Sequence, residues 1–480
     1  MAVTNYEQEL AFQTRIRRST NEFIKLVSDL WYDDTIELVL FRNQLIDRNV
    51  GEILNLLEYA TEFVEKPISI FDAVEIVKTL KLLKLPPAKI DIGKLVYEFQ
   101  KDTNNYNIYK FLSIQLKDVD KTKTLSPKDV VLYGFGRIGR LVAREIMGIT
   151  GKGQQLRLRA IVTRGKIDKT VLEKRASLLR NDSIHGDFSG TVQVDVKNEA
   201  LIINGTTVKI ISANTPEEID YTAYGIYDAL IIDNTGVFRD DKALNRHLKA
   251  NGVSKVLLTA PGKGVPNIVY GVNHCDIDPE KTNLVSAASC TTNAITPVLS
   301  VVDQVFGIEN GHIETIHAYT NDQNLVDNMH SKYRRGRAAA LNMVITETGA
   351  GAAVAKALPQ LEGKLTSNAI RVPVPNGSLV ILKLELKKSA SVAKINNTIK
   401  KFALEGNLVE QIKYSVDNEL VSSDIVGAPA PAIFDSNATI SAQKGKHVVL
   451  YVWYDNEYGY SHQVIRLAKH ISKVKRYTYY

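Results

Sequence analysis

The segment GFGRIGR, residues 134–140, follows the aliphatic run at residues 130–132 and opens a helical pattern over residues 138–147. Its G-x-G-x-x-G spacing gives each glycine a physical task. Gly134 makes the tight turn, Gly136 lets the backbone approach a pyrophosphate, and Gly139 allows the helix to pack closely on the strand. Because a strand precedes this turn and a helix follows it, the segment predicts a dinucleotide-binding site.

Short aliphatic runs alternate with helical patterns beyond this turn. The runs lie at residues 130–132, 160–162, 230–232 and 256–258. Such alternation is typical of a doubly wound parallel sheet. Beyond about residue 311 the apolar segments lengthen, as at residues 379–386 and 448–454, which indicates a half-exposed antiparallel sheet. We therefore expect an α/β Rossmann-type cofactor domain and an α+β catalytic domain with a mainly antiparallel sheet.

The first 120 residues have a different character. Only Gly51 and Gly93 of the 29 glycines fall there, and apolar residues recur at helical spacing, as in Phe23, Val27, Leu30 and Trp31. Residues 117–129 are polar and predict a linker. We expect three parts: an all-α extension over residues 1–120, a dinucleotide-binding domain over residues 128–289 that a C-terminal helix (residues 457–480) completes, and a catalytic domain over residues 290–456.

Composition narrows the class of protein. The net charge is +7. Residues 1–120 carry a net charge of about −4, and the remaining residues carry about +11. A basic body suits small phosphorylated ligands. The chain has no dense stripe of Lys and Arg residues, so we do not expect nucleic acid as its main ligand. It also has no apolar run long enough for a membrane span. With two cysteines and no secretory pattern at the start, we expect a cytoplasmic protein without a metal site.

Cys290 is the candidate nucleophile. It lies in SAASCTTNAITP, residues 286–297, between an apolar strand and a helix expected to begin near Thr291. The positive end of a helix dipole favours a thiolate, and the flanking Ser, Thr and Asn residues can cap the helix or donate to an anion. Cys275 lies in a turn-rich segment without these features, so we interpret it as unreactive.

Two further residues stand where chemistry is expected. His317 ends a predicted strand in HIETIHAYT, residues 312–320, beside several polar residues, and is the candidate base. The second strand of the cofactor domain ends at Thr163 and Arg164, where dinucleotide folds usually carry an acidic residue for the ribose hydroxyls. Thr and Arg can instead bind a 2′-phosphate, so this pair favours NADP.

From about residue 130 to the C-terminus the chain resembles the glyceraldehyde-3-phosphate dehydrogenase family. The motifs that carry the resemblance occur in the family's order: GFGRIGR, NDSIHG, DNTGVF, SCTTN, HAYTNDQ, RRGRAAA, RVPVPN and WYDNEYGYS. The resemblance implies reversible phosphorylating oxidation of glyceraldehyde 3-phosphate to 1,3-bisphosphoglycerate in glycolysis or gluconeogenesis, with NADP or NAD as cofactor. It implies that Cys290 forms a thiohemiacetal and then a thioester, that His317 is the base, and that the enzyme is a homotetramer.

The resemblance also implies binding residues. Those for the attacking phosphate are Ser289, Thr291, Thr348 and Gly349, and those for the substrate phosphate are Thr320, Arg335 and Arg371. Asn456 orients the nicotinamide carboxamide. The other cofactor residues are Gly134, Gly136, Arg137, Ile138, Gly139, Thr163, Arg164, Thr235, Gly236 and Thr259.

Two alternatives stay open at this stage. The same thiol and base would serve an erythrose-4-phosphate dehydrogenase, although Arg335 and Arg371 favour a triose phosphate. A scaffold role through residues 1–120 is compatible with either enzyme.

Overall fold

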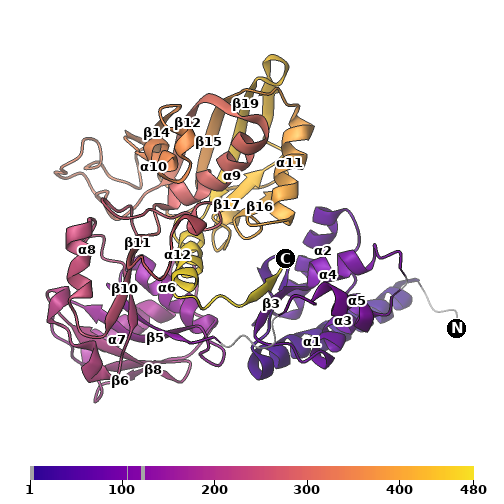
Figure 1. The fold of residues 1–480 in the computed structure, drawn as a ribbon, viewed down its shortest axis with the longest axis horizontal. Helices are drawn as coiled ribbons and strands as arrows, with labels where there is room; N and C mark the ends of the chain where they lie inside the picture. Colours follow the sequence, from indigo (N-terminus) through magenta and orange to yellow (C-terminus); the bar gives the residue numbers. More distant parts are fainter. Residues whose placement is uncertain (1–4, 105, 120–124) are drawn as a thin grey trace. The chain divides into compact units, whose positions relative to one another are not determined.

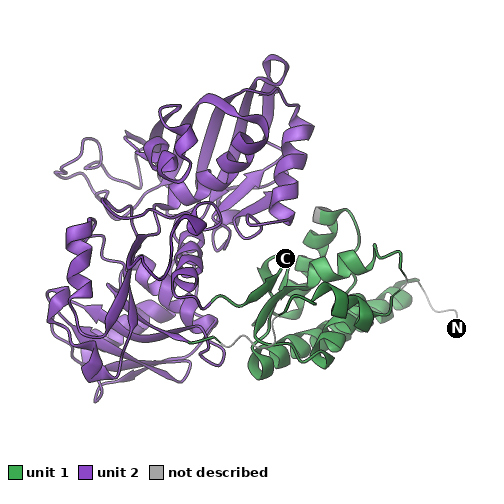
Figure 2. Cartoon of the chain, viewed as in Figure 1, with its two compact units in different colours: residues 1–126, 475–480 green, residues 127–474 purple. Residues whose placement is uncertain are grey.

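The computed structural model describes residues 5–104, 106–119 and 125–480. The chain divides into two compact units (Figure 2). The larger unit is residues 127–474, and the smaller unit is residues 1–126 together with residues 475–480. Within the described parts of the chain, every helix is too short or too polar to cross a membrane.

The first domain of the larger unit is built on an eight-stranded sheet with the order β11-β10-β9-β4-β5-β8-β7-β6 (Figure 1). Neighbouring strands from β11 to β8 are parallel, whereas β7 is antiparallel to both β8 and β6. The strands are β4 (Lys128–Tyr133), β5 (Leu156–Thr163), β6 (Val192–Asp195), β7 (Ala200–Ile203), β8 (Thr206–Ser212), β9 (Ala229–Asp233), β10 (Val253–Leu258) and β11 (Leu284–Ser286). The helices are α6 (Arg137–Gly148), α7 (Lys169–Arg180), α8 (Asp241–Leu248) and α12 (Tyr458–Ile471). The predicted Rossmann-type domain is confirmed.

The second domain of this unit holds a sheet with the order β13-β14-β12-β15-β19-β17-β16, to which β18 adds by pairing with β19. Most pairs are antiparallel; β12–β14 and β16–β17 are parallel. The strands are β12 (Ile308–Ala318), β13 (Val344–Thr346), β14 (Leu365–Val372), β15 (Ser378–Leu386), β16 (Ile412–Ser415), β17 (Ala432–Asp435), β18 (Ile440–Ala442) and β19 (His447–Tyr454). The helices are α9 (Cys290–Phe306), α10 (Ala350–Ala357) and α11 (Val392–Leu404). This is the expected α+β domain.

Burial explains why the two sheets look different in sequence. All five residues of β9 are buried, as expected for a parallel strand that is covered on both faces. Along β19 buried and half-buried residues alternate strictly, because one face of the sheet packs on helices, α9 among them, and the other is less covered.

The smaller unit is mostly helical. Its helices are α1 (Asn5–Asp34), α2 (Val50–Val64), α3 (Ile70–Leu82), α4 (Ile92–Phe99) and α5 (Ile108–Gln115). The apolar stripe predicted on the first helix is buried, namely Phe23, Val27, Leu30 and Trp31. The Ser69 side chain caps α3 by accepting from the backbone of Phe71. The prediction of a helical extension is therefore largely correct. The middle of the predicted linker, residues 120–124, lies outside the described residues.

The prediction that this extension is all-α is wrong. It contains a four-stranded sheet with the order β2-β1-β3-β20, made of β1 (Glu37–Leu40), β2 (Asn43–Gln44), β3 (Ala88–Asp91) and β20 (Tyr477–Tyr479). The strands were missed because none exceeds four residues, too few for a clear period. The last strand comes from the far end of the chain and runs parallel to β3. The expected C-terminal helix over residues 457–480 therefore ends at Ile471.

Candidate active site

The glycine turn between β4 and α6 fits a dinucleotide. Gly134 has φ +97°, a conformation that favours glycine, and a Cβ on Gly139 would stand 2.5 Å from the carbonyl oxygen of Gly134. A Cβ on Gly136 would meet no atom of the described residues within 4 Å, so the space at this exposed turn is open to a ligand. Arg137 and Ile138 lie in the first turn of α6, and the free backbone NH groups at the N-terminus of a helix favour a bound anion.

A second loop follows β9 at the same edge of the sheet. The backbone NH of Thr235 donates to Asp233 Oδ1 at 2.8 Å, and its hydroxyl donates to the same oxygen at 2.7 Å. The hydroxyl of Thr259 donates to the Asp233 carbonyl at 2.9 Å. Gly236 has φ +67° and lets the chain turn away. The carboxyl ends of adjacent parallel strands thus bring these predicted cofactor residues to one edge.

Cys290 is the first residue of α9. Ser289 caps this helix, since its side chain accepts from the backbone NH of Thr292 at 3.0 Å. The Cys290 Sγ lies 3.7 Å from His317 Nε2 and 4.0 Å from Thr291 Oγ1. Burial raises the pKa of the Cys290 thiol, and the positive charge of Arg371 acts in the opposite direction. The thiol and the candidate base, far apart in sequence, are therefore in contact.

His317 is buried near the end of β12. Burial, together with the neighbouring charge of Arg371, lowers the pKa of His317 to about 3, so the imidazole is neutral near pH 7. Its Nδ1 lies 2.7 Å from the carbonyl oxygen of Ala318, which can only accept, and close to Nη1 of Arg371, which can only donate, so either tautomer has a partner at Nδ1. In the tautomer with the proton on Nδ1, Nε2 is free to accept the thiol proton.

The predicted arginines have different surroundings. Arg371 lies opposite His317 in the parallel β12–β14 pair, and its Nη1 is 2.6 Å from His317 Nδ1. Arg335 is buried and donates to Asp322 and, at 3.1 Å, to Thr346 Oγ1. Thr320 also donates to Asp322. In this structure Arg371 is thus beside the nucleophile and base, whereas Arg335 and Thr320 both engage the Asp322 carboxylate.

The four residues expected at the attacking phosphate lie at the starts of two helices. Ser289 and Thr291 flank the nucleophile at the start of α9. Gly349 is the N-cap of α10 and Thr348 precedes it. The two helices pack against each other. Because the N-terminus of a helix carries partial positive charge, both ends favour an anion.

Asn456 follows β19 and is buried. Its Oδ1 accepts from the Ser378 hydroxyl at 2.8 Å, and the Ser378 oxygen accepts from the backbone NH of Ala318 at 3.1 Å. This short chain of hydrogen bonds joins Asn456 to the residue after His317, and it leaves the Asn456 Nδ2 as a donor for a ligand.

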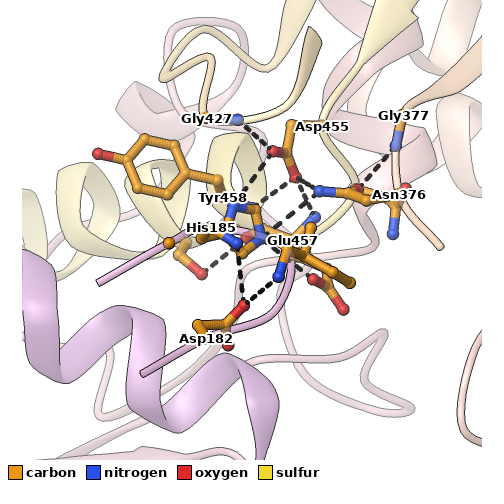
Figure 3. A network of polar contacts seen from close by, with 12 residues as sticks. Asp182, His185, Asn376, Gly377, Gly427, Asp455, Glu457 and Tyr458 are labelled. Carbon is orange, nitrogen blue, oxygen red and sulfur yellow. Dashed lines mark hydrogen bonds and ion pairs between the residues drawn. The ribbon is translucent and has the colours of Figure 1, made fainter. Parts of the chain in front are cut away.

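The residues before and after Asn456 in sequence, Asp455 and Glu457, belong to a polar network that also includes His185 (Figure 3). Asp455 accepts from the backbone NH groups of Glu457 at 2.8 Å and Tyr458 at 2.7 Å. Arg137, directly after the glycine turn, donates from Nε to both oxygens of Glu457 at 2.7 Å. His185 Nε2 lies 3.1 Å from the Glu457 carboxylate. The network therefore connects the cofactor turn with the chain on both sides of Asn456.

Asp182 completes the network. Arg137 donates to its two oxygens at 2.8 and 3.1 Å, and the backbone NH groups of Ile184 and His185 donate at 3.0 and 2.9 Å. Although burial alone would raise it, these donors lower the pKa of Asp182 to about 2. The guanidinium of Arg137 is therefore held between two protein carboxylates, those of Asp182 and Glu457.

Replacing Asp182 by Asn is expected to destabilise the protein by about 2 kcal/mol near neutral pH. The folded-state pKa lies below the unfolded value, so the carboxylate stabilises the fold above the unfolded pKa and loses this effect as the pH falls toward 2. The measurement is denaturant unfolding from pH 7 to pH 3, with Asp187→Asn, an exposed neighbour, as control. A stability difference that does not shrink on acidification would contradict this assignment.

The sequence patterns did not identify several residues of the site. The ring of Tyr454 packs edge-on against His317 at a centroid distance of 5.9 Å, and its hydroxyl lies 3.0 Å from Thr291 Oγ1. The carboxylates of Asp182 and Glu457 were missed as well. Tyr454 and Glu457 lie inside WYDNEYGYS and Asp182 inside NDSIHG, so the quoted motifs already contained the signal, but only the fold shows their contacts.

Together, the fold and comparisons with known proteins define a class. Residues 128–241 match the family model described as the NAD binding domain of glyceraldehyde 3-phosphate dehydrogenase, and residues 289–456 match the model of its C-terminal domain. The protein is thus an oxidoreductase with an NAD-binding Rossmann domain and a separate catalytic domain. The chain belongs to the glyceraldehyde-3-phosphate dehydrogenase family.

Curated relatives agree with this assignment. A Pseudomonas aeruginosa protein named glyceraldehyde-3-phosphate dehydrogenase-like protein is 47% identical over 457 residues, which cover 94% of this chain and 98% of that protein. The glyceraldehyde-3-phosphate dehydrogenase of Streptomyces coelicolor is 40% identical over 71% of this chain and 97% of its own. Glyceraldehyde-3-phosphate dehydrogenase 2 of Bacillus subtilis is 40% identical over 72% of this chain and 96% of its own. The Pseudomonas alignment is long enough to include most of the N-terminal extension.

Proposed function

We propose that the protein catalyses the reversible phosphorylating oxidation of glyceraldehyde 3-phosphate to 1,3-bisphosphoglycerate. The observation that carries the proposal is the thiol of Cys290 at the start of α9, 3.7 Å from the neutral imidazole of His317. The family's place in glycolysis or gluconeogenesis is part of the proposal.

The first half of the proposed reaction forms a thioester. His317 Nε2 takes the thiol proton while Cys290 Sγ bonds to the aldehyde carbon, and the imidazolium then returns that proton to the carbonyl oxygen, which becomes the hydroxyl of a thiohemiacetal. The substrate phosphate is assigned to Thr320, Arg335 and Arg371. When bound, the nicotinamide supplies a hydride acceptor for the aldehyde carbon. As the hydride leaves, His317 removes the hydroxyl proton, which leaves an acyl group on Cys290.

The second half releases the product. An oxygen of inorganic phosphate attacks the acyl carbon, the carbon–sulfur bond breaks, and Cys290 leaves as a thiolate. We assign the attacking phosphate to Ser289, Thr291, Thr348 and Gly349, because the starts of α9 and α10 favour an anion. The orientation of the nicotinamide is assigned to Asn456.

Turnover of two aldehydes tests this function. Glyceraldehyde 3-phosphate is expected to be oxidised faster than erythrose 4-phosphate, and oxidation of both is expected to need inorganic phosphate. A preference for erythrose 4-phosphate would select the alternative dehydrogenase. No turnover of either aldehyde would favour a scaffold protein that retains a dehydrogenase body.

The proposed cofactor is NADP, used at least as well as NAD. Thr163 and Arg164 stand at the end of β5, where a carboxylate would repel a 2′-phosphate. The expected kcat/KM with NADP therefore equals or exceeds that with NAD. Steady-state kinetics with both cofactors check this, and a preference for NAD of about tenfold, or 1.4 kcal/mol, would overturn it.

We further propose a cytoplasmic homo-oligomer, a tetramer by family. Both cysteines are free thiols, as a reducing compartment keeps them. The first half of α1 exposes Tyr6, Leu10 and Phe12, which favours a role of the extension in contacts with a sister subunit.

Removal of the smaller unit tests this role. Because β20 comes from the C-terminus, residues 1–124 and 475–480 must be removed together. The remaining protein is expected to keep its turnover and change its oligomeric size, measured by light scattering. Loss of turnover in a protein of unchanged fold and size would show that the extension takes part in catalysis. Unchanged turnover and size would rule out the assembly role.

A further inference from the structure

A cavity of about 430 Å³ lies beside the glycine turn at the carboxyl end of β5. Thr163, Arg164 and Arg175 line it together with Gly134 and Gly136. Arg175 lies on α7, twelve positions beyond Thr163. The spacing that locates the ribose-binding residue in dinucleotide folds therefore does not identify it. The helix brings its side chain to the same cavity wall as the end of β5.

Two polar groups on this wall lack a hydrogen-bond partner among the described residues. The hydroxyl of Thr163 and the Nε of Arg175 are both buried and make no hydrogen bond within the described parts of the chain. The residues that line the cavity include neither Asp nor Glu. Burial lowers the pKa of the Arg175 guanidinium, and no neighbouring carboxylate opposes this effect. The residues that line the cavity therefore supply no counter-charge to this partly desolvated cation.

Such a wall selects the chemistry of its ligand. Ribose hydroxyls in dinucleotide folds are usually held by a carboxylate, which accepts their protons. Hydroxyl and guanidinium donors instead match a group that is anionic and only accepts hydrogen bonds. A phosphate monoester supplies three such oxygens and close to two negative charges.

We propose that Thr163, Arg164 and Arg175 form a subsite for the 2′-phosphate of NADP, with Arg175 as its main specificity determinant. This proposal rests on the dinucleotide-binding role proposed above. Arg164 is exposed, whereas Arg175 is half-buried, and an ion pair in a partly desolvated place is less screened by solvent. Loss of Arg175 therefore weakens binding of the 2′-phosphate more than loss of Arg164 does.

The test compares two nucleotides that differ only in this phosphate. Binding of adenosine 2′,5′-bisphosphate and of adenosine 5′-monophosphate to the full chain is measured by calorimetry, and NADPH and NADH are compared by fluorescence. The wild type is expected to bind the bisphosphate more tightly. Arg175→Ala is expected to reduce the affinity for the bisphosphate at least about tenfold and to change the affinity for the monophosphate less than about twofold.

Two matched variants separate the site from general electrostatics and from misfolding. Lys174→Ala removes the same charge from an exposed neighbouring position of α7 and is expected to change neither affinity by more than about twofold. Arg175→Lys keeps the charge and is expected to lose less than Arg175→Ala, which reports on the site even if the alanine variant folds poorly.

The outcomes distinguish this proposal from the proposed enzyme activity. Equal affinities of the wild type for the two nucleotides, or equal losses of both in Arg175→Ala, overturn the subsite even if the enzyme turns over with NAD. A 2′-phosphate preference that disappears in Arg175→Ala supports it, even if no aldehyde is oxidised.

Discussion

Cys290→Ser is expected to abolish phosphorylating oxidation, with a loss of more than about 10³-fold in kcat. The serine hydroxyl has nearly the size of the thiol, so α9 and its Ser289 cap should persist. An alkoxide is much harder to form near neutral pH than a thiolate, and the hydroxyl therefore fails as a nucleophile. The measurement is turnover of glyceraldehyde 3-phosphate, with circular dichroism to show that the fold is kept.

Cys275→Ser is the matched control. This second cysteine is exposed and lies in a short 3-10 helix away from α9 in sequence, so its replacement should leave turnover unchanged. More than about a tenth of the wild-type activity in Cys290→Ser would refute the assignment of the nucleophile.

His317→Asn is expected to reduce kcat by about 10²–10⁴-fold, the usual contribution of a general base. The asparagine side chain is neutral and polar like the imidazole, but it cannot accept the thiol proton. The rate at which iodoacetamide alkylates Cys290 should also fall, because the thiol loses the Nε2 partner at 3.7 Å. Turnover and alkylation are measured on the same preparations.

His312→Asn serves as the control for this experiment. His312 lies on the same strand, is partly exposed and interacts with Thr366 and Glu314 rather than with the thiol. It should leave both rates unchanged. An alkylation rate of wild-type size in His317→Asn would mean that His317 does not activate Cys290.

Local sequence was enough for the larger unit because its signals are local. The G-x-G-x-x-G turn is defined by contacts within a few residues, and the positive φ of Gly134 and the close approach at Gly139 are the geometry that its spacing predicts. The continuous apolar run of β9 and the alternation in β19 likewise report burial directly. The smaller unit was harder, because its four strands are short and their pairing joins segments far apart in the chain.

The sequence by itself determined the type of each large domain, the thiol at a helix start and the absence of a carboxylate at Thr163. Only the tertiary structure decided which of these residues meet. The parallel pairing of β12 with β14 places Arg371 beside His317, and the packing of α7 brings Arg175 to the end of β5. It also assigned the last six residues to the N-terminal unit. The physical reason is that helix and strand periods are set by near neighbours, whereas charges and hydrogen-bond donors act through space on groups that the chain brings together only when it folds.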